Sequence, residues 1–411
     1  MPSNKLINFK LSNGLRVVYL HKKSAVAHFG LSILAGSRFE KNNEIGLAHF
    51  LEHCLFKGTK KRKAYHVLSR LDSVGGELNA YTSKEELCLY ASFSKKHTKR
   101  AIELIADISN NSVFPKKEIE KEKEIIFDEI NSYMDSPIDK IFDDFEELMF
   151  PNHPLGNNIL GSKETLKEFD TDMLNAYLKR FLNAQNCVLS FVGDTPIEQL
   201  KKSIEKEFSV FSDENHLITP KPFFDYKPFN VSRKEANYQT HFIIGSIAPG
   251  IKETSKVGLS LLINLLGGPA LNSRLTLSIR EKHGYAYNIE ANYTAYLDIG
   301  FWTIYIGCDK KHLKKCIKLV KKELETLCKK ELSTTQLNKA KEQMKGHIAL
   351  NMDSNVNLML NLGKSMLVYD KAFEINEIHQ EIDCVTSDNL KKIANDYLHP
   401  SNCSTLIFDL K

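Results

Sequence analysis

Two histidines, His49 and His53, lie four residues apart in an apolar stretch of the chain. On a helix, residues at this spacing share one face, with their Cβ atoms roughly 5–6 Å apart. Two imidazoles placed in this way can share a tetrahedral metal ion, and the spacing fits zinc. Glu52 would point about 60° around the helix from His49, so it could reach a water on the metal without binding the metal. We therefore predict that Glu52 is a general base, in a motif that inverts the commoner His-Glu-x-x-His order of metallopeptidases. The alternative is a chance pair of histidines on an apolar core helix.

A catalytic zinc site normally takes three protein ligands, so the pair of histidines predicts a third ligand elsewhere in the chain. Residues 117–133 have the pattern of a helix with one apolar side. Glu122 and Glu129 fall within about 70° of the centre of that side. Burial of an unpaired carboxylate costs several kcal/mol, which favours a metal-binding or catalytic role for these two residues. The alternative is a salt bridge, for instance from one of them to Lys123.

Length and composition indicate a globular protein with more than one domain. The chain has 411 residues, of which 42% are hydrophobic and 26% charged, and a chain of this length exceeds a single ordinary core. The net charge of +5 is small for this length, so we expect no nucleic-acid partner. Residues 1–20 lack a secretory signal pattern, and no stretch approaches the roughly 20 apolar residues of a membrane span. The eight cysteines form no C-x-x-C pair. We expect reduced, mostly buried thiols and a cytoplasmic location, or an organelle matrix if a transit peptide has been removed.

A faint internal repeat indicates that the chain is duplicated. Residues 27–33 resemble residues 240–246, and residues 186–189 resemble residues 402–405 at nearly the same offset. Both halves also have the same order of strand-like and helix-like segments. This predicts an α+β fold of two similar domains, each a mainly antiparallel sheet packed with helices.

Three prolines mark residues 212–230 as a linker between these domains. We therefore predict a zinc-bearing catalytic domain at 1–211 and a second domain at 231–411. The second half has Gly-Leu-Ser-Leu-Leu at 258–262 where a metal motif would fall. Only the first half is expected to bind zinc.

Four segments together resemble the pitrilysin or insulinase-type metallopeptidases, in particular the half-length subfamily that includes the mitochondrial processing peptidase. They are GLRV at 14–17, GLAHFLEHCLFKGT at 46–59, GGELNAYTS at 75–83 and EKEKEII at 120–126. The resemblance implies one zinc ion per chain, with His49, His53 and Glu129 as the metal ligands. It also implies that Glu122 supports the site from behind the ligands.

The same resemblance implies a substrate-binding apparatus that draws on both halves. Residues Asn79, Ala80, Tyr81 and Thr82 look like the edge strand that binds the substrate backbone as an added strand. Arg280 and Tyr287 match the arginine and tyrosine of the family's second half. Arg280 would bind substrate carbonyls, and Tyr287 would donate a hydrogen bond to the oxyanion. The preceding turn departs from the family pattern because it contains Pro269, which stiffens the loop, so the resemblance does not extend to the specificity of the processing peptidase.

These features predict a zinc metalloendopeptidase that cleaves short or unfolded peptides in a closed chamber. Zinc and Glu52 would activate a water to attack the peptide bond, with no covalent intermediate. Because the chain has both the zinc motif and the second-half arginine and tyrosine, we expect a homodimer. Two alternatives remain: a non-catalytic structural subunit like the core proteins of a respiratory complex, and the catalytic subunit of a heterodimer with an inactive partner.

Overall fold

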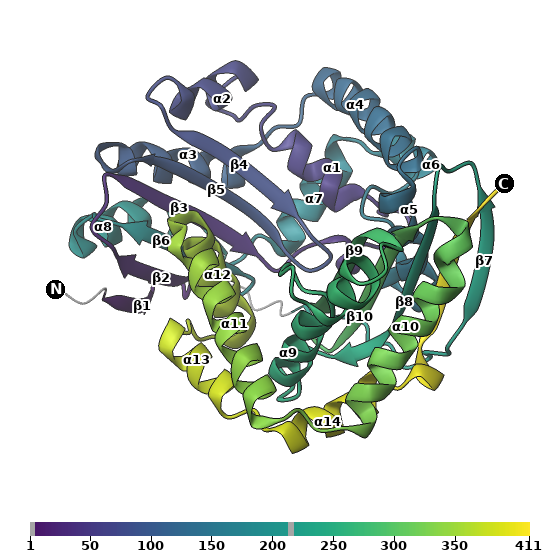
Figure 1. Cartoon of the computed structure of the whole chain (residues 1–411). Coiled ribbons are helices and arrows are strands. Elements are labelled where there is room, and N and C mark those ends of the chain that lie inside the picture. The colour runs from purple at the N-terminus through teal and green to yellow at the C-terminus, as the bar shows by residue number, and fades with distance from the viewer. Residues whose placement is uncertain (1–4, 213–217) are drawn as a thin grey trace. The chain divides into compact units, whose positions relative to one another are not determined.

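The structure is a computed structural model that describes residues 5–212 and 218–411. These residues form two compact units. Unit 1 contains Met1–Asn131, Asn157–Pro220 and Leu350–Phe373, and unit 2 contains Ser132–Gly156, Lys221–Ala349 and Glu374–Lys411. Each unit is built on one sheet with helices packed against it (Figure 1). This confirms the predicted α+β class.

The sheet of unit 1 has six strands in the order β1-β2-β6-β3-β5-β4. All neighbours are antiparallel except β2 and β6. The strands are β1 (Leu6–Lys10), β2 (Arg16–His21), β3 (Val26–Ile33), β4 (Glu77–Thr82), β5 (Leu87–Ser94) and β6 (Cys187–Gly193). The central strand β3 is buried along nearly its whole length, whereas β4 lies at one edge and is partly exposed. Among the described residues, the outer edge of β4 therefore pairs with no other strand.

The sheet of unit 2 has five strands in the order β7-β11-β8-β10-β9, and only β7 and β11 are parallel. The strands are β7 (Asn230–Glu235), β8 (Thr240–Pro249), β9 (Ala286–Ala295), β10 (Ile299–Cys308) and β11 (Ser404–Leu410). This order reproduces the last five strands of the first sheet, with the parallel pair in the same place. The repeated segments 27–33 and 240–246 are β3 and β8, at equivalent positions. The two sheets thus support the predicted duplication.

Helices surround both sheets. Those in or beginning in unit 1 are α1 (Leu47–Cys54), α2 (Ala64–Asp72), α3 (Thr98–Asn111), α4 (Lys116–Met134), α6 (Lys163–Glu168), α7 (Thr171–Phe181), α8 (Ile197–Phe208) and α12 (Asn355–Tyr369). Those in or beginning in unit 2 are α5 (Pro137–Met149), α9 (Lys256–Gly267), α10 (Lys310–Lys329), α11 (Thr334–Asp353), α13 (Ile375–Asp383) and α14 (Ser387–Tyr397). The predicted helix at 117–133 is confirmed as α4.

Two helices pack on the sheet encoded by the other half of the sequence. Helix α12 follows the second sheet's strand β10 in sequence, yet its residues Met359 and Leu362 pack on β2 and β6 of unit 1. Gly363 allows this helix to approach closely, because a Cβ there would lie 3.0 Å from the Ser32 hydroxyl. Reciprocally, Phe145 of α5 packs against Ile243 and other apolar residues of the second sheet. The compact units therefore differ from contiguous segments at 1–211 and 231–411 by this exchange.

The remaining expectations about the chain concern its linker, thiols and membrane segments. The predicted linker at 212–230 includes residues 213–217, which lie outside the described residues, and residues 218–229 form no helix or strand. Seven of the eight cysteines are buried, Cys384 is exposed, and all are free thiols, as expected. Among the described residues, no helix has the length and apolar character needed to cross a membrane.

Candidate metal centre

Helix α1 presents the His49–His53 motif on one side and packs its other side into the core of unit 1. Its buried residues include Leu47, Phe50 and Leu51, which anchor the helix by hydrophobic burial. The helix begins after Gly46, which has φ = 96° in the left-handed region. A side chain there would also clash with the backbone of Gly161, so this entry to the helix requires glycine.

The structure brings together His49, His53 and Glu129, the three predicted ligands. One candidate ligand atom from each residue lies within 4.8 Å of the others. The Nε2 atoms of both histidines are 3.8 Å from the Glu129 carboxylate oxygens. Glu129 comes from α4, so two helices that are far apart in sequence supply the three groups. All three side chains are partly exposed, as access for a water and a substrate requires.

The donor set and its spacing fit a zinc ion. Tetrahedral coordination with bonds of about 2.0–2.2 Å places ligand atoms roughly 3.4 Å apart, close to the observed 3.8 Å separations. Two imidazoles and one carboxylate are also a known catalytic zinc set. Burial, assisted by the neighbouring His53, lowers the pKa of His49 to about 4. His49 is therefore neutral near pH 7, which is the form that binds a metal.

Glu122 contacts one of the predicted ligands, and its cationic partner is not Lys123. Its buried carboxylate is 2.6 Å from Lys57 Nζ and 3.4 Å from His53 Nδ1. Lys123 instead bonds to Glu120 and to the Lys167 carbonyl. The specific alternative of a Glu122–Lys123 salt bridge is therefore wrong, because Lys123 turns toward other groups. A carboxylate that contacts the second nitrogen of a metal-binding histidine fixes the orientation of its ring.

Glu52 lies on the same helix as the histidines and faces the edge strand β4. Burial raises the pKa of Glu52 above its ordinary value, while hydrogen bonds from Thr82 oppose this shift. The charges of His53 and Glu129 act on it in opposite directions. A carboxyl group with a raised pKa, next to a metal centre, is suited to proton transfer.

The predicted substrate-binding residues 79–82 form most of β4. They pair with β5 along one side only, from Asn79 with Tyr90 to Thr82 with Leu87. Thr82 lies on the face toward α1, where its hydroxyl is 3.5 Å from the Ala48 carbonyl. Burial raises the pKa of Tyr81, whose hydroxyl hydrogen-bonds to Glu86. Tyr81 is thus engaged within the protein, so any contact that it makes with an added strand would come from its backbone.

Arg280 and Tyr287 lie side by side in unit 2. Arg280 is on the π-helical turn Thr276–Glu281, and Tyr287 is at the start of β9, the edge strand equivalent to β4. The Arg280 guanidinium is 4.9 Å from the centroid of the Tyr287 ring, a cation–π distance. Tyr287 is 79% exposed. Both side chains therefore form one accessible pair.

Two residues that support the centre were not predicted from sequence. Glu40 is buried, and its carboxylate accepts hydrogen bonds from the backbone N–H groups of Gly46 and Ala48 at 3.0 and 2.7 Å. It therefore caps the first turn of α1, which has no cap of its own. Burial raises the pKa of Glu40 to about 8, against the effect of these bonds. Lys57, the partner of Glu122, is the second. No periodic pattern marks either residue, because both act across elements.

Comparisons with known proteins identify the family and the fold. The profile described as "Insulinase (Peptidase family M16)" matches residues 16–163, and "Peptidase M16 inactive domain" matches residues 168–344. An uncharacterized zinc protease of Bacillus subtilis, YmxG, is 32% identical over 389 residues, covering 94% of each chain. The mitochondrial-processing peptidase subunit beta of Bos taurus is 29% identical over 400 residues, which are 95% of this chain and 81% of that protein.

Solved structures share the fold. A protease from Helicobacter pylori superimposes with a TM-score of 0.89 at 21% identity, covering 99% of both chains. A Pseudomonas fluorescens structure described as a peptidase M16 inactive domain gives a TM-score of 0.92 at 16% identity, covering 99% of this chain and 98% of that chain. The 32% identity to the Bacillus zinc protease over nearly the whole chain, with the two profile matches, shows that the chain belongs to the insulinase family of peptidases, peptidase family M16.

Proposed function

We propose that this chain is a zinc metalloendopeptidase whose metal ligands are His49, His53 and Glu129. The observation that carries the proposal is the convergence of these three groups within 4.8 Å, with Glu52 on the same helix as the histidines. The relatives named zinc proteases support a metallopeptidase as the broader class. One zinc ion per chain is expected, because the second half has no equivalent motif.

Zinc held at this centre would polarise the scissile carbonyl and make a water more acidic. Glu52 takes the proton from the attacking water and passes it to the leaving amine. The raised pKa of Glu52 suits it to both transfers, because its carboxylate is a stronger base than an exposed one. Glu122 holds His53 in place through its contact with Nδ1. Attack by water forms no bond between enzyme and substrate.

The substrate would bind as an extended strand along the free edge of β4. Backbone pairing reads main-chain groups at alternate residues, so it accepts many sequences but requires an unfolded segment. Arg280 would bind substrate carbonyls, and the Tyr287 hydroxyl would stabilise the oxyanion. The free edge of β4 and the exposure of Tyr287 support these roles. The proposed substrates are therefore short or unfolded peptides. Their cleavage would take place in a closed chamber.

Replacement of Tyr287 by phenylalanine should lower kcat by about 10²–10³, because one oxyanion donor typically contributes this much. KM should change little, since the ring and its packing against Arg280 are retained. Steady-state kinetics on an internally quenched peptide would measure both values. The matched control is Tyr238→Phe, which removes the hydroxyl of a fully exposed tyrosine in the same unit. Equal kcat values for Tyr287→Phe and wild type would exclude this role.

A homodimer is the proposed assembly, because one chain carries both the zinc motif and the Arg280–Tyr287 pair. A relative that is named a "subunit" keeps a heterodimer as the second candidate. The test is native mass measurement of the chain purified alone, combined with cleavage of a random peptide library. A dimer that cleaves peptides would support the proposal. Zinc-loaded protein without cleavage would favour a missing partner, whereas a chain that binds no zinc would favour a structural subunit.

A further inference from the structure

A basic pocket lies between the loop after α1 and the beginning of α4. It has a volume of about 550 Å³ and is lined by residues 57–65, Val113, Pro115 and the first turn of α4. We call this site the basic pocket. Its charged residues are six cations and one carboxylate, namely Lys57, Lys60, Lys61, Arg62, Lys63, Lys117 and Glu118. A cavity of this size falls in the range of small-ligand sites.

Three of these lysines form no ion pair within the described part of the chain, although the charge of Lys117 helps to lower the pKa of Glu118. Lys60, Lys63 and Lys117 are exposed, and within residues 5–212 and 218–411 none of them has a carboxylate at ion-pair distance. The single acidic residue, Glu118, pairs with Lys121 outside the pocket at 2.8 Å. Like charges held together repel, and a bound anion relieves that repulsion. The pocket therefore has positive charge that no ion pair of the described residues neutralises.

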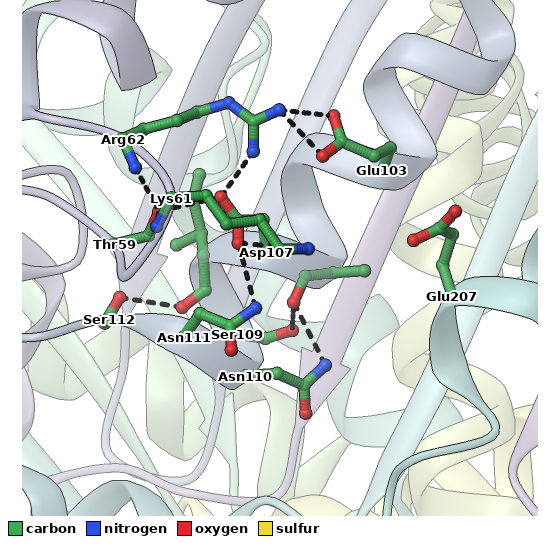
Figure 2. A network of polar contacts seen from close by, with 12 residues as sticks. Thr59, Lys61, Arg62, Glu103, Asp107, Ser109, Asn110, Asn111, Ser112 and Glu207 are labelled. Carbon is green, nitrogen blue, oxygen red and sulfur yellow. Dashed lines mark hydrogen bonds and ion pairs between the residues drawn. The ribbon is translucent and has the colours of Figure 1, made fainter.

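The loop that carries Lys60 and Lys63 is held by hydrogen bonds and ion pairs to helix α3. Figure 2 shows Arg62 bonded to both Glu103 and Asp107. The Thr59 hydroxyl donates a hydrogen bond to Asp107 at 2.8 Å. The Thr59 hydroxyl oxygen also accepts hydrogen bonds from the backbone N–H groups of Lys61 and Arg62, at 3.1 and 3.0 Å. Asp107 is buried, so this network is shielded from water. Arg62 and Thr59 fix the loop, while Lys60 and Lys63 remain available to a ligand.

Helix α4 adds a second source of positive potential. Lys117 and Glu118 in its first turn line the pocket, so the beginning of this 19-residue helix faces the cavity. The Pro115 carbonyl accepts hydrogen bonds from the N–H groups of Glu118 and Ile119, whereas those of Lys116 and Lys117 come before the first helical bond. The first turn also carries the positive end of the helix dipole. Such helix ends bind phosphate and carboxylate groups. The lysines, the helix end and the cavity all favour the same ligand chemistry.

We propose that the basic pocket binds a ligand with several closely spaced anionic oxygens. Two sources share this chemistry: a free compound with a chain of phosphate groups, and an acidic segment of a peptide substrate. The site goes beyond the proposed peptidase activity, and anion binding does not depend on that activity. Only the assignment to an acidic substrate segment rests on the proposed function. It is connected to the metal centre, however, because Lys57 lines the pocket and also bonds to Glu122, which contacts His53.

The test is calorimetric titration of the full chain with inorganic tripolyphosphate and, separately, with a hexaglutamate peptide. We expect one site per chain, with affinity that weakens as salt is added. The variant Lys60→Gln/Lys63→Gln/Lys117→Gln should lose at least tenfold in affinity. Tighter binding of tripolyphosphate would assign the pocket to a free phosphate compound, and tighter binding of hexaglutamate would assign it to an acidic substrate segment.

The matched control removes the same charge elsewhere. Lys314, Lys318 and Lys322 are exposed on α10 in unit 2, so their triple replacement by glutamine should leave affinity unchanged. Equal loss in both triple variants would show a general charge effect and overturn the site, as would the absence of binding for both probes. Thermal unfolding of both variants checks that they are folded. Because binding is measured without turnover, a chain that failed to cleave peptides would leave this result intact.

Discussion

Replacement of Glu52 by glutamine is expected to abolish peptide cleavage while zinc remains bound. The amide cannot accept a proton from the attacking water, and general-base catalysis of this kind typically contributes about 10²–10⁴-fold. The metal ligands are unchanged, since Glu52 is not one of the three converging groups. The measurements are kcat/KM on a quenched peptide and zinc content by elemental mass spectrometry. We expect a loss of at least about 10³-fold with an unchanged zinc-to-protein ratio.

Glu124→Gln is the matched control for this variant. Glu124 is exposed on α4, on the side away from the buried face of the helix, so the same chemical change there should leave kcat/KM near that of wild type. Cleavage retained by Glu52→Gln would rule out the mechanism, whereas loss of zinc from this variant would indicate that Glu52 helps to hold the metal.

Replacement of Glu129 by glutamine should remove the metal. A neutral amide is a much weaker zinc ligand than a carboxylate, and residues behind the ligands alone typically contribute 10–100-fold to affinity. Loss of a direct ligand should therefore weaken zinc binding by at least about 100-fold, and cleavage should be lost with it. Competition with a fluorescent zinc chelator would measure the affinity.

Two further variants are compared with Glu129→Gln for their effect on zinc affinity. Glu122→Gln keeps all three ligands but removes the charge that contacts Lys57 and His53, so it should weaken zinc binding by about 10–100-fold. Asp128→Asn changes an exposed residue beside Glu129 and should leave affinity unchanged. Zinc binding by Glu129→Gln as tight as that of wild type would show that Glu129 is not a ligand.

The buried strands could be predicted from the sequence, because a buried strand leaves a local run of apolar residues. The repeated apolar segments at 27–33 and 240–246 became the buried strands β3 and β8. The exchange of α5 and α12 could not be predicted in this way. An amphipathic pattern such as that of α5 shows which side of a helix is buried, but not which sheet covers it. Sequence order favoured packing of α5 on the first sheet and of α12 on the second sheet. In the structure each of these helices packs on the opposite sheet.

The residues of the metal centre also include some that the sequence pattern marks and some that it does not. Helical periodicity predicted that His49 and His53 share one face, and it left Glu122 and Glu129 as candidates for the third ligand. Only the family resemblance favoured Glu129. The contributions of Glu40 and Lys57 could not. Each contacts its target from a loop or from beyond a helix end, where no period relates sequence spacing to distance. The apolar side of α4 likewise predicted that Glu122 would be buried, but not which lysine would neutralise its charge.

Zinc dependence tests the central claim most directly. The chain purified alone would be analysed for zinc by elemental mass spectrometry and assayed for peptide cleavage before chelation, after chelation and after zinc is restored. The account predicts one zinc per chain, loss of cleavage with the metal, and recovery that is complete at one equivalent of zinc. Cleavage at an undiminished rate by the metal-free chain would contradict it.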